Sequence, residues 1–369
     1  MNKASGIELR RVSKTYGKNS PVIENLDLQV KQGSFTILLG PSGCGKSTIL
    51  RMIAGLEKET AGDIFLDGKN MRGVGPGDRQ IAMVFQNYAL YPTMTVKGNI
   101  EFGLKNMKVP KHEREARIAE IVEKVGLSEY LHRKPQHLSG GQRQRVALAR
   151  AIVKKPKVFL MDEPLSNLDA KLRAQIRTDL IELHRNLGTT FVYVTHDQVE
   201  AMSMASDIVL LEQGKIRQQD APESIYSSPR NLFTARFIGS PPMNVVNVDR
   251  VPRDCASSLP AGTAVLGFRP EKTVVHDNEG GQKNDSDFNL DLNSEFNPDF
   301  NNDSDHIFLR GELVAREMLG DHTLYKLKTE GGYIHAKSTG GAVVEYGRRT
   351  ISVDKKFLYC FDAKGDRVV

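Results

Sequence analysis

The sequence has no long apolar run and little cysteine. No stretch approaches the roughly 20 apolar residues that a helix needs to cross a bilayer, and the first residues lack the apolar core of a signal peptide. The three cysteines, Cys44, Cys255 and Cys360, lie far apart and form no CxxC pair. This spacing argues against disulfides and against a zinc site. The sequence therefore predicts a soluble, intracellular protein.

The chain contains a glycine-rich segment between a predicted strand and a predicted helix. Phe35–Leu39 is a short apolar run typical of a buried strand, and Ser47–Ala54 has the pattern of a helix. Glycines in such a loop let successive N–H groups point into one concavity, at a helix N-terminus that favours an anion. The segment consists of Gly40, Pro41, Ser42, Gly43, Cys44, Gly45, Lys46, Ser47 and Thr48. It is a predicted phosphate loop, in which Lys46 reaches the β- and γ-phosphates of ATP and Ser47 binds Mg²⁺. We expect the Cys44 thiol in it to be accessible to alkylation.

Two adjacent acids follow another apolar run. Val158–Met161 predicts a central parallel strand, and Asp162 and Glu163 come directly after it. Carboxylates at this position are costly unless their charge is used. Alone, such a pair is more often a turn or a helix cap. Beside a phosphate loop, Asp162 is a candidate Mg²⁺ ligand acting through water, and Glu163 a candidate general base that polarises the attacking water.

Leu138 precedes the segment Ser139, Gly140, Gly141 and Gln142, where Ser139 is the predicted N-cap of a helix over 142–150. Taken alone, this segment is more typical of an ordinary capped helix start. Because it comes about twenty residues before the acidic strand end, it resembles the signature motif of the ATP-binding-cassette (ABC) ATPases. The resemblance implies a head-to-tail homodimer, in which each signature motif closes on the ATP held by the other subunit.

The resemblance implies roles for further residues. Gln86, after the apolar run 81–85, matches the glutamine loop that senses Mg²⁺ and the attacking water. His196, after a predicted strand at 190–195, matches the switch histidine that contacts the γ-phosphate. Tyr16 matches the aromatic residue that stacks on adenine, although a strand-end tyrosine is an alternative. Asp169 matches the aspartate of the D-loop, which touches the partner subunit. This chain departs from the usual family pattern at Asn167 and Gly98, where a small residue and an acidic residue are expected.

The 369 residues are enough for two domains. Residues 1–235 are expected to form an α/β P-loop NTPase core of the ABC type. Within it, residues 87–156 are mainly helical, because Lys111–Val125 places apolar residues at i, i+3, i+4 and i+7. The resemblance makes this helical subdomain the part that docks onto the transmembrane partner. Residues 236–369 contain short β-like runs separated by glycines, typical of a small β-barrel-like (OB-like) domain. Its segments 237–244 and 267–271 resemble the linker and regulatory domain of carbohydrate-importer ATPases, and a purely structural dimerisation module is the alternative.

Residues 277–305 differ from the rest in composition, with nine acids, one lysine and seven asparagines. Few aliphatic residues and a high net charge predict a disordered insert. Since the whole chain carries +6 and the insert −8, the remainder carries +14. A basic surface is compatible with anionic lipid or nucleic acid, but most such charge is simply solvated, and no nucleic acid is expected.

These features predict the ATPase subunit of an importer, most simply one for a carbohydrate or a polyol phosphate. The expected partners are a second copy, two integral-membrane permease subunits and, indirectly, an extracytoplasmic substrate-binding protein. The expected location is the cytoplasmic face of the membrane. Importers of polyamines or inorganic ions remain alternatives, because they carry related β domains. A soluble ABC ATPase of DNA repair or translation usually has a coiled coil or tandem cassettes, and this chain has no heptad run and one copy of each motif.

Overall fold

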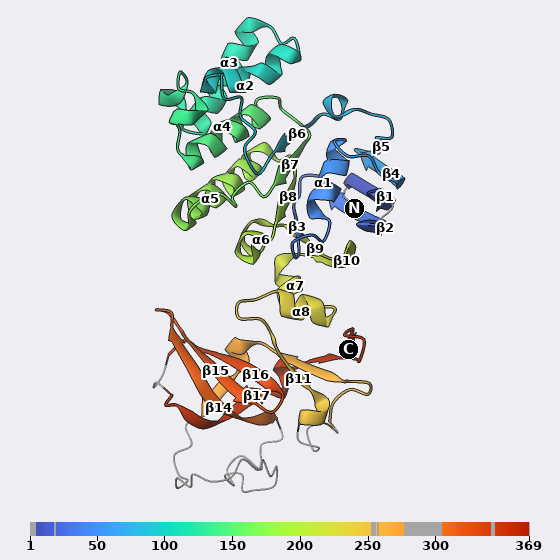
Figure 1. Ribbon diagram of the computed structural model, residues 1–369, viewed down its shortest axis with the longest axis vertical. Coiled ribbons are helices and arrows are strands. Elements are labelled where there is room, and N and C mark those ends of the chain that lie inside the picture. The colour runs from blue at the N-terminus through green and yellow to red at the C-terminus, as the bar shows by residue number, and fades with distance from the viewer. Residues whose placement is uncertain are drawn as a thin grey trace. The chain divides into compact units, whose positions relative to one another are not determined.

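The computed structural model describes residues 5–17, 20–251, 256, 258–276, 305–340 and 344–368. The chain divides into two compact units, Met1–Ile225 and Tyr226–Val369, which are described separately (Figure 1). The acidic insert expected at 277–305 lies outside the described residues except for Asp305. Within the described ranges, no helix combines the length and the apolar character needed to cross a membrane.

The first unit is built on a sheet of six strands in the order β10-β9-β3-β8-β7-β6. The strands are β3 (Phe35–Leu39), β6 (Ile81–Val84), β7 (Val158–Asp162), β8 (Thr190–Thr195), β9 (Asp207–Glu212) and β10 (Lys215–Asp220). All neighbouring pairs are parallel except β9 with β10. Every residue of β3, β7 and β8 is buried, which explains their continuous apolar character. The predicted central strand at 158–161 is confirmed.

A second sheet of the first unit has the order β2-β1-β4-β5 and is antiparallel. Its strands are β1 (Ser5–Lys14), β2 (Ile23–Lys31), β4 (Ala61–Leu66) and β5 (Lys69–Asn70). Burial largely alternates along β2, as expected for a strand with one face on the core. The opening strands expected near 7–12 and 22–30 are therefore confirmed, whereas the hairpin of β4 and β5 was not predicted.

Among the described residues, six α-helices belong wholly to the first unit. They are α1 (Lys46–Ala54), α2 (Val96–Asn106), α3 (Lys111–Lys124), α4 (Gly140–Ile152), α5 (Ala170–Leu187) and α6 (Gln198–Met204). In Figure 1, α2, α3 and α4 gather at one end of this unit; all three lie within the predicted helical subdomain, residues 87–156. Side chains of Thr95, Ser139, Asp169 and Asp197 cap α2, α4, α5 and α6. The caps explain why these helices begin where they do.

The strand register brings the sites together at one edge of the large sheet. Leu39 at the end of β3 lies opposite Thr195 of β8, and Asp162 at the end of β7 lies opposite Val194. The loops that follow β3, β7 and β8 therefore start side by side. This is the edge where open α/β sheets bind ligands.

The second unit contains two antiparallel sheets, ordered β11-β12-β18-β19 and β13-β17-β14-β15-β16. The strands are β11 (Asn244–Asn247), β12 (Val265–Phe268), β13 (Val274–His276), β14 (His306–Met318), β15 (Thr323–Thr329), β16 (Gly332–Ser338), β17 (Gly347–Asp354), β18 (Tyr359–Phe361) and β19 (Arg367–Val368). Leu266 and Phe268 of one sheet share a core with Ile307, Leu327 and Ile351 of the other. One shared core inside curled sheets is consistent with the expected OB-like fold. The short α8 (Leu232–Phe237) precedes these strands, and α7 (Pro222–Ser227) spans the boundary between the units.

A buried arginine, Arg79, binds the C-terminal end of α1, the helix that follows the phosphate loop. Arg79 is 8% exposed, and its guanidinium donates to the carbonyl oxygens of Met52 and Ile53 at 2.8 and 2.9 Å. It also donates to Val74 and Met71. Burial lowers the pKa of Arg79, and the carbonyl oxygens at the C-terminal end of α1 compensate its charge. No motif in the sequence marks this residue.

We expect Arg79→Met to lower the free energy of unfolding by about 3 kcal/mol, because it strands several buried carbonyl oxygens. Chemical denaturation of the full chain, followed by circular dichroism, measures the change. The matched control is Arg72→Met, since the Arg72 side chain is 63% exposed beside Asp63; it should change stability by less than about 1 kcal/mol. Equal effects of the two substitutions would contradict this account of Arg79.

Candidate active site

The predicted phosphate loop connects β3 to α1 and has the backbone of an anion cradle. Gly43 and Gly45 have φ angles of +80° and +102°, which residues with a Cβ rarely adopt. A Cβ on Gly45 would also lie 2.4 Å from Ile23 Cδ1. The loop ends at the N-terminus of α1, where no side chain caps the helix. Its free N–H groups can therefore bind an anion such as a phosphate.

Lys46 lies within this loop and is 5% exposed. Its ammonium donates to the carbonyl oxygens of Gly40 and Pro41 at 2.8 and 2.9 Å. These bonds hold the cation at the loop, where it can exchange carbonyl oxygens for phosphate oxygens. The expectation of an accessible Cys44 thiol is wrong: Cys44 is 5% exposed, and burial raises the pKa of its thiol. A protonated, buried thiol reacts slowly with alkylating agents.

Ser47 and Asp162, two of the three residues predicted for the metal site, are hydrogen-bonded to each other; the third is Gln86. The Ser47 hydroxyl donates to Asp162 Oδ1 at 2.7 Å, although the residues are 115 positions apart. Asp162 is 6% exposed, and Arg51 Nη2 lies 3.8 Å from its Oδ2. A hydroxyl and a carboxylate beside a phosphate cradle are oxygen donors of the kind that Mg²⁺ binds together with phosphates. The donor set thus fits the expected ion.

Glu163 and His196 also lie together. His196 Nδ1 is 3.3 Å from Glu163 Oε1, and the Glu163 N–H donates to the carbonyl oxygen of Val194 at 3.1 Å. Glu163 has a φ angle of +43°, an uncommon conformation for a residue with a side chain. Ser166 stabilises it, because its hydroxyl donates to the Glu163 carbonyl oxygen at 2.9 Å. The backbone thus turns sharply after β7 and brings the carboxylate to the imidazole.

The predicted glutamine loop and D-loop are joined by side chains. Gln86 Nε2 donates to Ser166 Oγ at 3.3 Å, and Asn167 Nδ2 donates to the Gln86 carbonyl oxygen at 3.0 Å. The Asp169 side chain caps α5 by accepting from the Leu172 N–H at 2.9 Å. Asn167, the departure from the family pattern, therefore links the two loops inside one chain.

A buried hydrogen-bond network lies beside the predicted switch histidine, His196, and no motif in the sequence marks it. Glu200 is 3% exposed, and its Oε2 accepts from the hydroxyls of Tyr193 and Thr195 at 2.8 and 2.7 Å. Burial raises the pKa of Glu200. Asp197 follows His196 in the sequence, and its Oδ2 forms an ion pair with Arg173 Nη1 at 3.6 Å.

Arg173 also donates to the Leu168 carbonyl oxygen at 3.0 Å, so it connects the D-loop with the histidine loop. Arg173 and Glu200 line a small cavity of about 60 Å³ together with Glu163 and His196. The only signal for this network in the sequence was Glu200, four residues after His196. This signal was weak, because a glutamate at this position is also ordinary for the first turn of a helix such as α6.

The predicted signature motif begins α4 as expected. Ser139 and Gln142 form a capping box: the Ser139 hydroxyl accepts from the Gln142 N–H at 3.3 Å, and the Ser139 N–H donates to Gln142 Oε1 at 2.9 Å. A Cβ on Gly141 would lie 2.8 Å from methyl groups of Leu172, so the glycine allows α5 to pack closely. Among the described residues, no hydrogen bond or ion pair joins the motif to the phosphate loop of the same chain.

Tyr16, the predicted adenine partner, is 39% exposed just beyond the end of β1. The Lys14 ammonium lies 4.7 Å from the centre of its ring. Lys14 pairs with Ile23 across β1 and β2, and Ile23 contacts the position of Gly45 in the phosphate loop. The structure therefore brings the aromatic ring and the phosphate cradle to the same part of the first unit.

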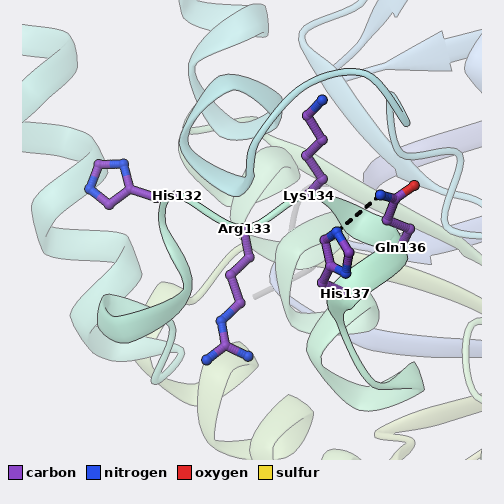
Figure 2. Close-up of a pocket in the computed structure, with 5 residues that line it drawn as sticks. All are labelled: His132, Arg133, Lys134, Gln136 and His137. Atoms are coloured by element: carbon purple, nitrogen blue, oxygen red, sulfur yellow. Dashed lines mark hydrogen bonds between the residues drawn. The ribbon is translucent and has the colours of Figure 1, made fainter.

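A larger hollow of about 610 Å³ lies outside this group of residues. It is lined by one short segment before the signature motif: His132, Arg133, Lys134, Gln136 and His137. Figure 2 shows that these side chains fan out from a single loop, and only Gln136 and His137 are linked, at 3.0 Å. Side chains that point apart do not form a convergent binding site, and none of the predicted site residues lies in this hollow.

The sequence of this chain is similar to those of known proteins of one family. The ABC transporter family model matches residues 23–166. The sn-glycerol-3-phosphate import ATP-binding protein UgpC of Brucella abortus is 51% identical over 99% of both chains. The oligosaccharides import ATP-binding protein MsmX of Bacillus subtilis is 56% identical over 64% of this chain and 65% of its own.

Solved structures are similar to part of the chain. A dimeric post-hydrolysis state of the ATP-binding cassette MJ0796, bound to ADP and Pi, aligns with a TM-score of 0.54 and 33% identity. The alignment covers 58% of this chain and 98% of that one. CbiO1 of Clostridium perfringens, part of the transporter complex cbiONQ, aligns with a TM-score of 0.56 and 28% identity over 60% of this chain and 90% of its own.

Proposed function

Since this chain belongs to the ABC transporter family, we propose that it is the ATP-hydrolysing subunit that energises an importer. The observation that carries the proposal is the meeting of Ser47 with Asp162 and of Glu163 with His196 at one edge of the sheet. This edge also holds the phosphate loop. An oxygen pair for a metal, a carboxylate base and an imidazole beside a phosphate cradle are the groups that phosphoryl transfer to water requires.

In the proposed reaction, the N–H groups of the phosphate loop and Lys46 bind the phosphates of ATP and stabilise their charge. Ser47, and Asp162 through water, would hold Mg²⁺, which would supply further neutralisation of that charge. Glu163 accepts a proton from the attacking water. His196 contacts the γ-phosphate and, through its 3.3 Å approach to Glu163 Oε1, orients the base. Gln86 donates a hydrogen bond to Ser166 and is the proposed contact for the same water.

The proposed active form is a head-to-tail homodimer. Among the described residues, no hydrogen bond joins the signature motif to the phosphate loop of its own chain. The N–H groups of Gly140 and Gly141 at the start of α4 would suit the γ-phosphate of a second chain. Closure on two nucleotides would drive two permease subunits at the cytoplasmic face of the membrane from inward- to outward-facing. Hydrolysis would then reset them. An external substrate-binding protein would deliver the cargo to the permease.

The proposed cargo is a carbohydrate or a polyol phosphate. It is supported by the names of the relatives, one a glycerol-phosphate importer subunit that matches almost the whole chain, including the second unit. The second unit is the proposed regulatory domain.

Affinity purification from detergent-solubilised membranes tests the importer role. A tagged full-length chain should co-purify with two polytopic membrane proteins, and its removal from the cell should abolish uptake of labelled glycerol 3-phosphate or of an oligosaccharide. Restoring the chain should restore uptake, whereas Lys46→Ala, which is expected to lose ATP binding, should not. Recovery with ribosomes or DNA instead would overturn the proposal in favour of a soluble ABC ATPase.

A further inference from the structure

Lys14 is a buried cation that no predicted role explains. It ends β1 and is 8% exposed. Its ammonium donates to Glu57 Oε1 at 2.6 Å and to the Lys58 carbonyl oxygen at 2.7 Å. A buried ammonium is costly unless its donors are satisfied, and these two bonds fix its position. The ammonium also lies 4.7 Å from the centre of the Tyr16 ring.

The two bonds connect Lys14 to the end of the helix that begins at the phosphate loop. Glu57 and Lys58 follow the C-cap of α1 at Gly55. On the other side, Lys14 pairs with Ile23, whose side chain occupies the space beside Gly45. The ammonium is therefore held by elements that also shape the phosphate loop, and any nucleotide bound there has a fixed relation to it.

Tyr16 has ring surface left for a second partner. The ammonium lies over its ring, and the residue is nevertheless 39% exposed. A cation over an aromatic ring is attracted to its electron-rich face, so Lys14 restricts the rotation of the tyrosine. It also draws electron density from the ring, which makes the free face a better partner for an electron-rich purine.

We propose that Lys14 is a positioning residue for the nucleotide base: it holds the Tyr16 ring so that its free face stacks on adenine. This inference rests on the proposed ATP-binding function. It assigns part of the affinity for ATP to a residue that does not touch the nucleotide. Lys14 acts on the base and not on the phosphates. Its removal should therefore weaken the binding of ATP and leave the binding of inorganic triphosphate unchanged.

The absence of tryptophan from the sequence offers a direct probe. The variant Tyr16→Trp in the full chain has a single tryptophan, at the proposed stacking position, and ATP should quench its fluorescence. Adding Lys14→Met to this variant should raise the Kd for ATP about threefold to tenfold, as expected for the loss of a cation–π contact and the freeing of the ring. Lys14→Arg, which keeps a cation, should restore most of the affinity. The Kd for inorganic triphosphate, measured by calorimetry, should be the same in all three variants.

Lys69→Met is the matched control, because Lys69 is exposed on β5 and its side chain makes no hydrogen bond, ion pair or ring contact within the described ranges. It should leave both affinities unchanged. If Lys14→Met does not fold, Glu57→Gln replaces it, since this change removes the ion pair that holds the ammonium and should weaken ATP in the same direction.

The outcomes separate this inference from the proposed function. Unchanged ATP affinity in Lys14→Met or its substitute, while Tyr16→Ala in the wild-type background weakens ATP, would overturn the role of Lys14 alone. Equal losses for ATP and inorganic triphosphate would also overturn it, because they would mean that Lys14 acts through the phosphate loop. No binding of either ligand to the wild type would overturn the proposed function itself.

Discussion

Glu163→Gln should bind ATP and dimerise but hydrolyse ATP roughly 10²–10⁴-fold more slowly than the wild type. The amide keeps the size of the carboxylate and its place beside His196, but it cannot accept the proton of the attacking water. The nucleotide therefore stays intact and the closed dimer accumulates. Phosphate release measures the first effect, and size-exclusion chromatography with and without ATP measures the second.

Glu182→Gln on the exposed surface of α5 is the matched control and should hydrolyse ATP at the wild-type rate, since Glu182 makes no hydrogen bond or ion pair within the described ranges. Wild-type turnover in Glu163→Gln would remove Glu163 from the mechanism. Loss of ATP binding as well as turnover would show that Glu163 contributes to binding ATP before hydrolysis.

Mixing two inactive variants should recover one complete site if ATP is bound between two chains. Lys46→Ala removes the phosphate-binding cation, and Ser139→Arg blocks the signature motif, so each homodimer has two defective sites. The mixed dimer has one site with both defects and one with an intact phosphate loop facing an intact signature motif. ATP should therefore stabilise the mixed dimer several-fold over either homodimer, because charge-assisted contacts to the phosphate are complete at one site.

The association of differently tagged chains, pulled down with and without ATP, is the measurement. Turnover is a poorer readout, since it can require both sites to be active. The Ser139 side chain also caps α4, and losing the cap costs about 1 kcal/mol, so Ser139→Ala mixed with Lys46→Ala serves as the control for stability. Identical association in the mixed sample and in both homodimers would contradict a shared site and the closing-dimer mechanism.

Much of the local structure could be predicted from the sequence. The strand at 35–39, the helix after the phosphate loop and the Ser139 cap were all expected, and each is observed. Each depends on residues close together along the chain: an apolar run, glycines at positive φ, and a hydroxyl three positions before the N–H that it accepts. Such features are encoded within one or two turns of backbone, and motif spacing then identified the family.

The sequence did not by itself determine which distant side chains meet, and only the tertiary structure decided it. Ser47 meets Asp162 and Asn167 meets the Gln86 carbonyl because parallel strands place their carboxyl ends at one edge of the sheet. Arg79 carries no motif, and its importance arises only where α1 ends against a loop that brings carbonyl oxygens around it.

The exposure of the Cys44 thiol was also decided by the tertiary structure and not by the local sequence. Its place in a glycine-rich loop predicted exposure, but the packing of the loop buries it. A side chain's partners and burial depend on the free energy of packing all elements together, which no local pattern contains. The residue types and their order therefore determined the family and the candidate chemistry of this chain. The tertiary structure decided how the site is held in place, because contacts across the sheet edge exist only once the strands have paired.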